Sequence, residues 1–147
     1  MTAALASPRS VAYGAALLRI SLGMLFLVHG LTKLLVFTPA GSAAYFQSLG
    51  LPGALAYVSM TLEFGLGVLL LLGTYARRDV LLGVPLLLGT VVAVHGDNGF
   101  GFSNPGGGWE YPALWAVLLI VQALPGDGAF AVKPSRGAVF HPSRSCP

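Results

Sequence analysis

Ionisable side chains interrupt the most apolar segments of this 147-residue sequence, where a charge is costly to bury. His29 and Lys33 stand four residues apart, so a helix would present them on one face. Glu63 lies in the middle of the next apolar segment, and His95 and Glu110 bound a loop rich in Gly and Asn. Carboxyl and imidazole groups exchange protons, and a lysine ammonium attracts carbonyl oxygens. Residues of these types could therefore bind and protonate a small polar group.

Arg19 lies near the same helical face as Lys33. It precedes Lys33 by 14 residues, which is a rotation of roughly 40° at about 100° per residue. Charges inside apolar segments usually face the interior of a bundle, pair with one another and mark a site. We expect Glu63 to pair with Lys33 or Arg19, and Glu110 to pair with His95 or Lys33. The alternative is that these ion pairs only hold the bundle together.

We predict one ligand-binding site from these residues. It would be formed by Arg19, His29, Lys33, Glu63, His95 and Glu110. Glu63 and His95 are the candidates for catalytic proton transfer. A quinone is a possible ligand or cofactor, because it needs an apolar slot with a proton donor and a cation near its carbonyl groups.

Other site chemistries lack their motifs. The histidines and glutamates resemble the inventory of a metal site, but the Glu-x-x-His and His-Glu-x-x-His spacings and a Cys pair are absent, so we predict no metal. The glycine-rich stretch from Gly99 to Gly108 does not stand between a strand and a helix, which argues against a phosphate loop. We interpret Ser21, Ser59 and Thr61 as helix-packing hydroxyls and not as nucleophiles.

The composition indicates an integral membrane protein. Hydrophobic residues make up 55% of the chain and charged residues 9%, whereas soluble domains carry about a quarter charged residues. The net charge of +3 is not gathered into a basic patch interleaved with aromatics, which excludes nucleic acid as a partner. The lipid bilayer is the expected partner. The single cysteine, Cys146, can form no internal disulfide.

Four apolar segments predict an all-α, integral membrane four-helix up-down bundle. The helices are expected at about 11–35, 53–73, 79–96 and 110–125, within a transmembrane domain of residues 11–127. Residues 1–10 would be a cytoplasmic N-terminal segment and residues 128–147 a disordered cytoplasmic tail. The first apolar run is too long for a signal peptide and is interpreted as a retained helix. Pro85 is expected in the first turns of the third helix, where proline is tolerated.

The basic residues predict the orientation in the membrane. Arg9, Arg77, Arg78, Lys133 and Arg136 fall on one side of a four-crossing chain, and the opposite loops carry no Lys or Arg. Positive charge collects on the cytoplasmic side, so both termini are expected in the cytoplasm. His29, Lys33, Glu63, His95 and Glu110 would then lie at mid-depth or in the outer half. Glycines recur in every expected helix and are interpreted as packing residues.

The sequence resembles the DoxX family. The resemblance is carried by LLRISLGMLFLVHGLTKL (17–34), GLPGALAYVSMTLEFGLGVLLLLGTYAR (50–77), VVAVHGDNGF (91–100) and GGGWEYPAL (106–114), and it covers roughly residues 15–128. The family pattern is matched by Arg19, His29, Gly30, Lys33, Glu63, Gly67, His95 and Glu110. The resemblance implies a bacterial inner-membrane four-helix protein. It also implies a link to redox systems, such as a thiosulfate:quinone oxidoreductase or a membrane complex that handles oxidative stress.

We therefore expect a DoxX-like membrane subunit of a redox system that holds a quinone or another small lipophilic molecule in the outer half of the bundle. If the chain has activity of its own, it would belong to a quinone-linked oxidoreductase. One alternative is a non-enzymatic membrane scaffold that docks a soluble oxidoreductase. Another is a small transporter or proton-coupled channel, although no inverted repeat is visible in the sequence.

Overall fold

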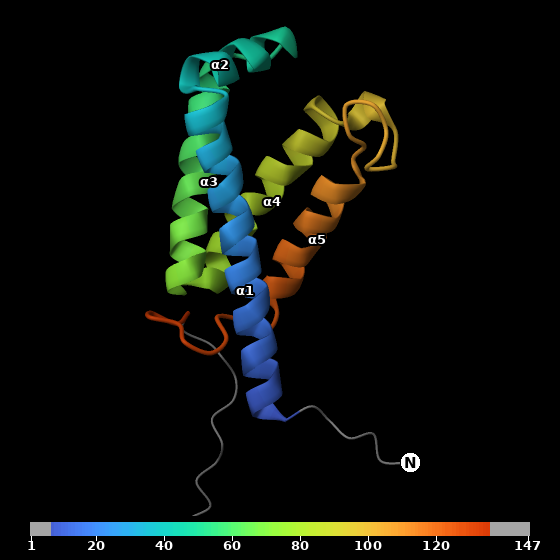
Figure 1. Cartoon of the computed structure of the whole chain (residues 1–147). Coiled ribbons are helices and arrows are strands. Elements are labelled where there is room, and N and C mark those ends of the chain that lie inside the picture. The colour runs from blue at the N-terminus through green and yellow to red at the C-terminus, as the bar shows by residue number, and fades with distance from the viewer. Residues whose placement is uncertain (1–6, 136–147) are drawn as a thin grey trace, which may run out of the picture.

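The computed structural model describes residues 7–135, and within this range the chain is all-α (Figure 1). Helices α1 and α3 form one antiparallel pair, and helices α4 and α5 form a second. In order, the elements are α1 (Pro8–Leu31), the π-helix η1 (Thr32–Val36), α2 (Pro39–Ser48), α3 (Ala54–Leu72), α4 (Ala76–Ala93), the 3₁₀-helix η2 (Gly96–Asn98) and α5 (Glu110–Ala123). We call the end that carries α2 and η2 the outer end, and the opposite end the basal end.

Small residues allow α1 and α3 to approach closely. A Cβ atom at Gly67 would lie 2.9 Å from the backbone nitrogen of Leu27, and one at Gly23 would lie 3.1 Å from the Gly67 carbonyl oxygen. Glycines commonly serve this purpose between membrane helices. Not every predicted packing glycine behaves this way, because a Cβ atom added at Gly65 or at Gly89 would meet no atom of another element within 4 Å.

The α4–α5 pair leans away from the α1–α3 pair toward the outer end (Figure 1). Apolar side chains from all four helices fill the space between the pairs nearer the basal end. Fully buried members of this core are Leu22, Phe26, Leu70, Val80 and Leu119. The bundle is therefore closed by its core at one end, and its two pairs separate at the other.

A short helix, α2, lies across the outer end of α3 (Figure 1). Its N-terminus carries clear signals, since the Thr38 side chain accepts a hydrogen bond from Gly41 N at 3.2 Å and Pro39 occupies the first turn. None of the four helices expected from the sequence covers residues 39–48, so α2 is a helix that the apolar segments do not predict.

α4 begins at Ala76, earlier than expected, so the prediction that Pro85 lies in the first turns of its helix is wrong. The charged residues Arg77 and Arg78 suggest a loop, yet they belong to the first turn together with Asp79. Pro85 therefore lies in the helix interior, where its ring nitrogen cannot donate to the Leu81 carbonyl.

The segment after α5 folds back across the basal end. Val132 N donates to Leu72 O at 3.0 Å, and Ser135 N donates to the buried Asp127 carboxylate at 2.7 Å. The sequence predicts a disordered tail from residue 128, whereas residues 128–135 make these contacts. The rest of that prediction, residues 136–147, lies outside the described residues, as do residues 1–6.

Two helical stretches within residues 7–135 are long and apolar enough to cross a membrane: Pro8–Val36 and Ala54–Leu72. The 14-residue α5 is apolar but shorter. At about 1.5 Å per residue it spans roughly 21 Å, against about 30 Å of hydrocarbon in a typical bilayer.

Candidate functional site

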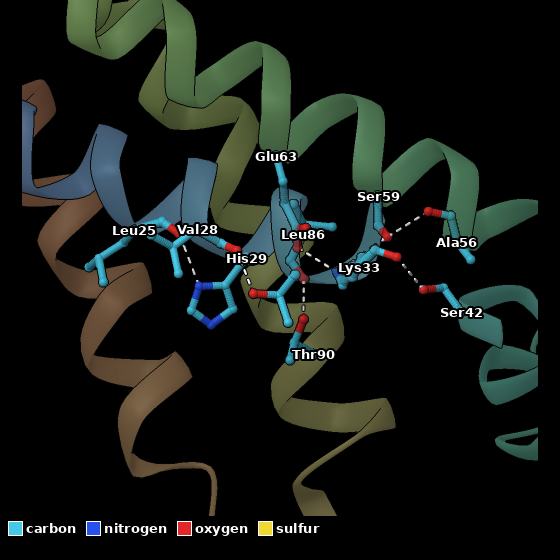
Figure 2. A network of polar contacts seen from close by, with 11 residues as sticks. Leu25, Val28, His29, Lys33, Ser42, Ala56, Ser59, Glu63, Leu86 and Thr90 are labelled. Carbon is cyan, nitrogen blue, oxygen red and sulfur yellow. Dashed lines mark hydrogen bonds and ion pairs between the residues drawn. The ribbon is translucent and has the colours of Figure 1, made fainter. Parts of the chain in front are cut away.

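An ion pair between η1 and α3 forms the centre of the candidate site (Figure 2). Lys33 Nζ lies 2.6 Å from Glu63 Oε1 and donates a longer bond, of 3.4 Å, to Ser59 Oγ. The Glu63 side chain is only 9% exposed and that of Lys33 is 24% exposed. Of the two pairings predicted for Glu63, the structure thus shows the one with Lys33.

The local backbone brings these two side chains together. Lys33 lies in the π-helix η1, where Phe37 N donates to Thr32 O at 3.0 Å; such wider turns are frequent at functional sites. One turn earlier, Gly30 lets α1 approach α3, because a Cβ atom there would lie 3.4 Å from Glu63 Cβ.

His29 has one ring nitrogen committed to its own helix. Its Nδ1 lies 2.9 Å from Leu25 O (Figure 2), and because a carbonyl oxygen only accepts, Nδ1 must carry the proton of this bond. The ring also packs against Trp115 of α5, with ring centroids 4.9 Å apart. No hydrogen bond to His29 Nε2 is found among residues 7–135.

His95 is held in a similar way at the end of α4. Its Nδ1 lies 2.8 Å from Gly107 O, so this nitrogen also carries the proton. Asn98 donates to the same carbonyl oxygen at 3.0 Å and fixes the loop that supplies it. The Nε2 atom of His95 likewise lacks a hydrogen bond within the described part of the chain.

A cavity of about 670 Å³ lies beside the ion pair, between the two helix pairs and α2. This volume is within the range of ligand-binding pockets. Four predicted site residues line it: His29, Lys33, Glu63 and His95. Aromatic side chains supply much of the remaining wall, namely Phe37, Tyr45, Phe46, Tyr111 and Trp115. We call this the outer cavity.

Two atoms beside the outer cavity are buried and have no hydrogen-bond partner: Glu63 Oε2 and Trp115 Nε1. A buried polar atom without a partner costs free energy, so such atoms are rare and often belong to binding sites. One of them is an acceptor and the other a donor. Within residues 7–135, no group of three or more His, Cys, Asp or Glu residues is arranged to hold a metal ion.

Arg19 lies away from the outer cavity, toward the basal end. It is 1% exposed, and its guanidinium donates to Leu70 O at 2.7 Å, to Leu71 O at 3.3 Å and to Ala129 O at 3.0 Å. These are the last carbonyls of α3 and one carbonyl of the segment that follows α5. The predicted pairing of Arg19 with Glu63 is not present.

Glu110 also lies outside the outer cavity. Its side chain is exposed, and Oε2 accepts a hydrogen bond from Phe102 N at 3.1 Å within the loop before α5. The structure therefore shows neither a pairing with His95 nor one with Lys33.

A second hollow, of about 750 Å³, occupies the basal surface. Among residues 7–135, those that border it are Tyr75, Arg78, Asp79, Lys133 and Pro134. None of the predicted site residues is among them, and no buried atom without a partner belongs to them. The outer cavity is therefore the better candidate site, although it is slightly smaller.

The aromatic wall and the hydroxyl partner are not among the site residues predicted from the sequence. Trp115 and Tyr111 belong to a strongly apolar helix, in which the spacing of apolar residues does not distinguish a cavity wall from the other faces. Ser59 is interpreted as a packing hydroxyl, and it does donate to Ala56 O at 2.9 Å, yet it also contacts Lys33 Nζ. Its position four residues before Glu63, on the same helical face, is the signal that could have identified it.

Comparisons with known proteins bear on the family of this chain. The sequence model of a family described as DoxX matches residues 14–96, which contain all four predicted residues of the outer cavity. The chain is 32% identical over 126 residues to a protein of Bacillus subtilis (strain 168) named "Putative oxidoreductase CatD". That alignment covers 86% of this chain and 89% of the relative. No solved structure was found to match the chain.

Proposed function

Because this chain belongs to the DoxX family, as its sequence motifs predicted, we propose that it is an integral membrane subunit of a redox system. In this proposal the outer cavity binds a quinone or another small lipophilic molecule. The observation that carries the proposal is the Lys33–Glu63 pair at the wall of a large aromatic cavity, with a second Glu63 oxygen left without a partner.

The outer cavity has the parts that a quinone site needs. Its aromatic walls suit a flat, apolar ring, and ligand pockets typically combine such walls with a few polar groups. Lys33 would approach a carbonyl oxygen of the ligand, and Glu63 and His95 would accept or supply protons. Arg19 and Glu110 would support the fold around the site, because they lie outside the cavity.

The surface of the bundle supports a membrane location. Large apolar side chains are exposed on several helices, for example Leu17 (69%), Leu35 (71%) and Val92 (78%). In water such a surface would be an aggregation hazard, whereas in a bilayer it faces lipid. We propose that α1 with η1, α3, α4 and α5 all cross the membrane, with the shorter helices accommodated by local thinning of the bilayer.

The charges support one orientation. Arg9, Arg78 and Lys133 lie at the basal end, whereas the described loops of the outer end contain no Lys or Arg. By the positive-inside rule the basal end and both termini would face the cytoplasm of a bacterial cell, and the outer cavity would lie toward the far side of the inner membrane.

The redox role rests on the family and on the relative. CatD bears the name of an oxidoreductase, and the proposal extends that kind of chemistry to this chain. A soluble or membrane oxidoreductase would be its partner, and any activity of its own would be quinone-linked.

The test is quinone binding by the purified full-length chain in lipid nanodiscs, with a short-chain benzoquinone as the probe. Lys33→Ala should weaken binding by about tenfold, the effect of losing one charge-assisted hydrogen bond. Glu63→Gln should weaken binding as well, because it removes the carboxylate that holds the Lys33 ammonium beside the cavity. Asp97→Asn, which changes an exposed outer carboxylate, is the matched control and should bind like the unmodified chain. Binding that is unchanged in both cavity variants would refute the proposal.

A further inference from the structure

The polar atoms left without partners around the outer cavity are mainly hydrogen-bond acceptors. The Nδ1 atoms of His29 and His95 donate to carbonyl oxygens, so Nε2 of each neutral ring carries a lone pair and no proton. Glu63 Oε2 is a third acceptor, since its carboxylate is held at Oε1 by the Lys33 ammonium. All three residues line the cavity.

Two side chains of the cavity wall act only as donors. Trp115 Nε1 carries one proton and has no partner. Lys33 Nζ has three protons, of which two are directed to Glu63 Oε1 and Ser59 Oγ, so one is left for a ligand. The hydroxyl groups of Tyr45 and Tyr111, which also line the cavity, can donate or accept and therefore suit either kind of ligand.

A quinone and its reduced form differ in this respect. The two carbonyl oxygens of a quinone only accept hydrogen bonds, so an oxidised ring could use the Trp115 and Lys33 donors but would leave all three acceptors unpaired. The hydroxyl groups of a hydroquinone both donate and accept. They could pair with acceptors and donors together. Of the three acceptors, Glu63 Oε2 is the buried one, so it gains most from a hydroxyl donor.

We propose that the outer cavity preferentially binds the reduced, dihydroxy-aromatic form of its ligand, with one hydroxyl group donating to Glu63 Oε2. This inference rests on the proposed function and adds to it the hydrogen-bonding character of the ligand. The quinone form binds more weakly, because its carbonyl oxygens can pair with donors only.

One movement is needed for this contact. Glu63 Oε2 and Trp115 Nε1 are covered by neighbouring side chains in this structure, although both residues line the cavity wall. The carboxylate turns about its terminal torsion, which has a broad energy profile, and thereby directs Oε2 to the ligand while Lys33 follows it. The Trp115 ring is packed between His29 and Phe26, with centroid distances of 4.9 and 4.7 Å, and stays in place.

The experiment compares three ligands of nearly the same shape on the unmodified full-length chain in nanodiscs, under anaerobic conditions. They are tetramethylbenzoquinone, its hydroquinone, and the dimethyl ether of that hydroquinone, which keeps the oxygens but lacks the hydroxyl protons. Isothermal titration calorimetry should give a dissociation constant for the hydroquinone that is at least about tenfold lower than that for the quinone. It should also be lower than the dissociation constant for the ether.

The Glu63→Gln variant sharpens this test. A glutamine amide can donate to a carbonyl as well as accept, so the preference for the hydroquinone should fall to about twofold or less. Asp97→Asn should keep the full preference, and a size-exclusion profile like that of the unmodified chain shows that each variant is folded. If Glu63→Gln fails to fold, the three-ligand comparison still decides on its own.

The outcomes separate the two proposals. A quinone that binds as tightly as the hydroquinone, or more tightly, overturns the preference but leaves the proposed function standing. An ether that binds as well as the hydroquinone also overturns it, because the hydroxyl protons would then contribute nothing. If none of the three ligands binds, the proposed function fails, and this inference fails with it.

Discussion

Two basic side chains on the same helix, Arg19 and Lys33, are held in different ways. Arg19 is fully buried, and its guanidinium donates to the carbonyl oxygens of Leu70, Leu71 and Ala129. Lys33 is partly exposed beside the outer cavity, and its main partner is the Glu63 carboxylate, which has an oxygen to spare. A charge held by backbone carbonyls stabilises the fold. A charge pair that has an unpaired oxygen and lies beside a cavity is suited to bind a ligand.

The different roles of Arg19 and Lys33 follow from the groups with which each side chain pairs. The last carbonyls of a helix have no partner within it and carry the negative end of the helix dipole. Arg19 satisfies two of these carbonyls on α3 and joins them to the segment after α5. The Lys33–Glu63 pair closes no helix end, and a partly buried ion pair of this kind is weak evidence for stability.

The strongest test of this comparison removes the arginine. Arg19→Met should lower the free energy of unfolding by about 3 kcal/mol, because three buried or part-buried carbonyl oxygens lose a charged donor. The measurement is thermal unfolding in detergent, with Arg78→Met, an exposed basal residue, as the control. The folded fraction of Arg19→Met should bind the quinone probe as the unmodified chain does; a selective loss of binding with normal stability would reverse the roles of the two residues.

A smaller effect is expected from the contact that sets the distance between α1 and α3. Gly67→Ala should destabilise the chain by about 1–3 kcal/mol, since the added methyl group would meet Leu27 at a distance too short for packed atoms. Gly65→Ala, two residues earlier on the same helix, has open space and should change stability by less than about 0.5 kcal/mol. Equal effects in the same unfolding assay would show that the helices are not packed through Gly67.

The smallest effect on stability is expected at the ion pair itself. Lys33→Met or Glu63→Leu alone leaves one charge without its partner, whereas the double variant removes both charges and should cost only about 1 kcal/mol or less. A double-mutant cycle of unfolding free energies measures this, and quinone binding should be weakened by about tenfold or more in all three variants. If the double variant is as unstable as the sum of the two single variants and still binds the probe, the pair is structural.

Much of the fold could be predicted because the apolar runs and their Pro and Gly boundaries are local signals. The π-helix η1 and helix α2 could not be predicted from such signals. The π-helix lies where α1 packs against α3 next to Glu63, which is a contact between residues far apart in the sequence. The basic residues Arg77 and Arg78 suggest a loop, and their charge is unfavourable at a helix N-terminus. Asp79 in the same turn is favourable there, and α4 includes all three residues.

The candidate site could be predicted in part, because the spacing of residues along a helix is also a local signal. His29 and Lys33 share a face by their spacing, and Glu63 is the natural partner for a lysine inside an apolar bundle. Arg19 shares the face but lies ten residues before His29, which is about 15 Å along the axis and out of reach. Glu110 depends on the path of its loop, and the aromatic wall depends on how the two helix pairs separate, neither of which is encoded in local spacing.

The most direct test of the account is to find where the ligand binds. Photoaffinity labelling of the full-length chain in nanodiscs with an azido-benzoquinone, followed by peptide mass spectrometry, reports the residues next to the probe. We predict labels on Tyr45, Tyr111 or Trp115 of the outer cavity, which disappear when unlabelled quinone competes. Labels confined to the basal end around Tyr75 and Lys133, or labels that do not respond to competition, would contradict the assignment of the site to the outer cavity.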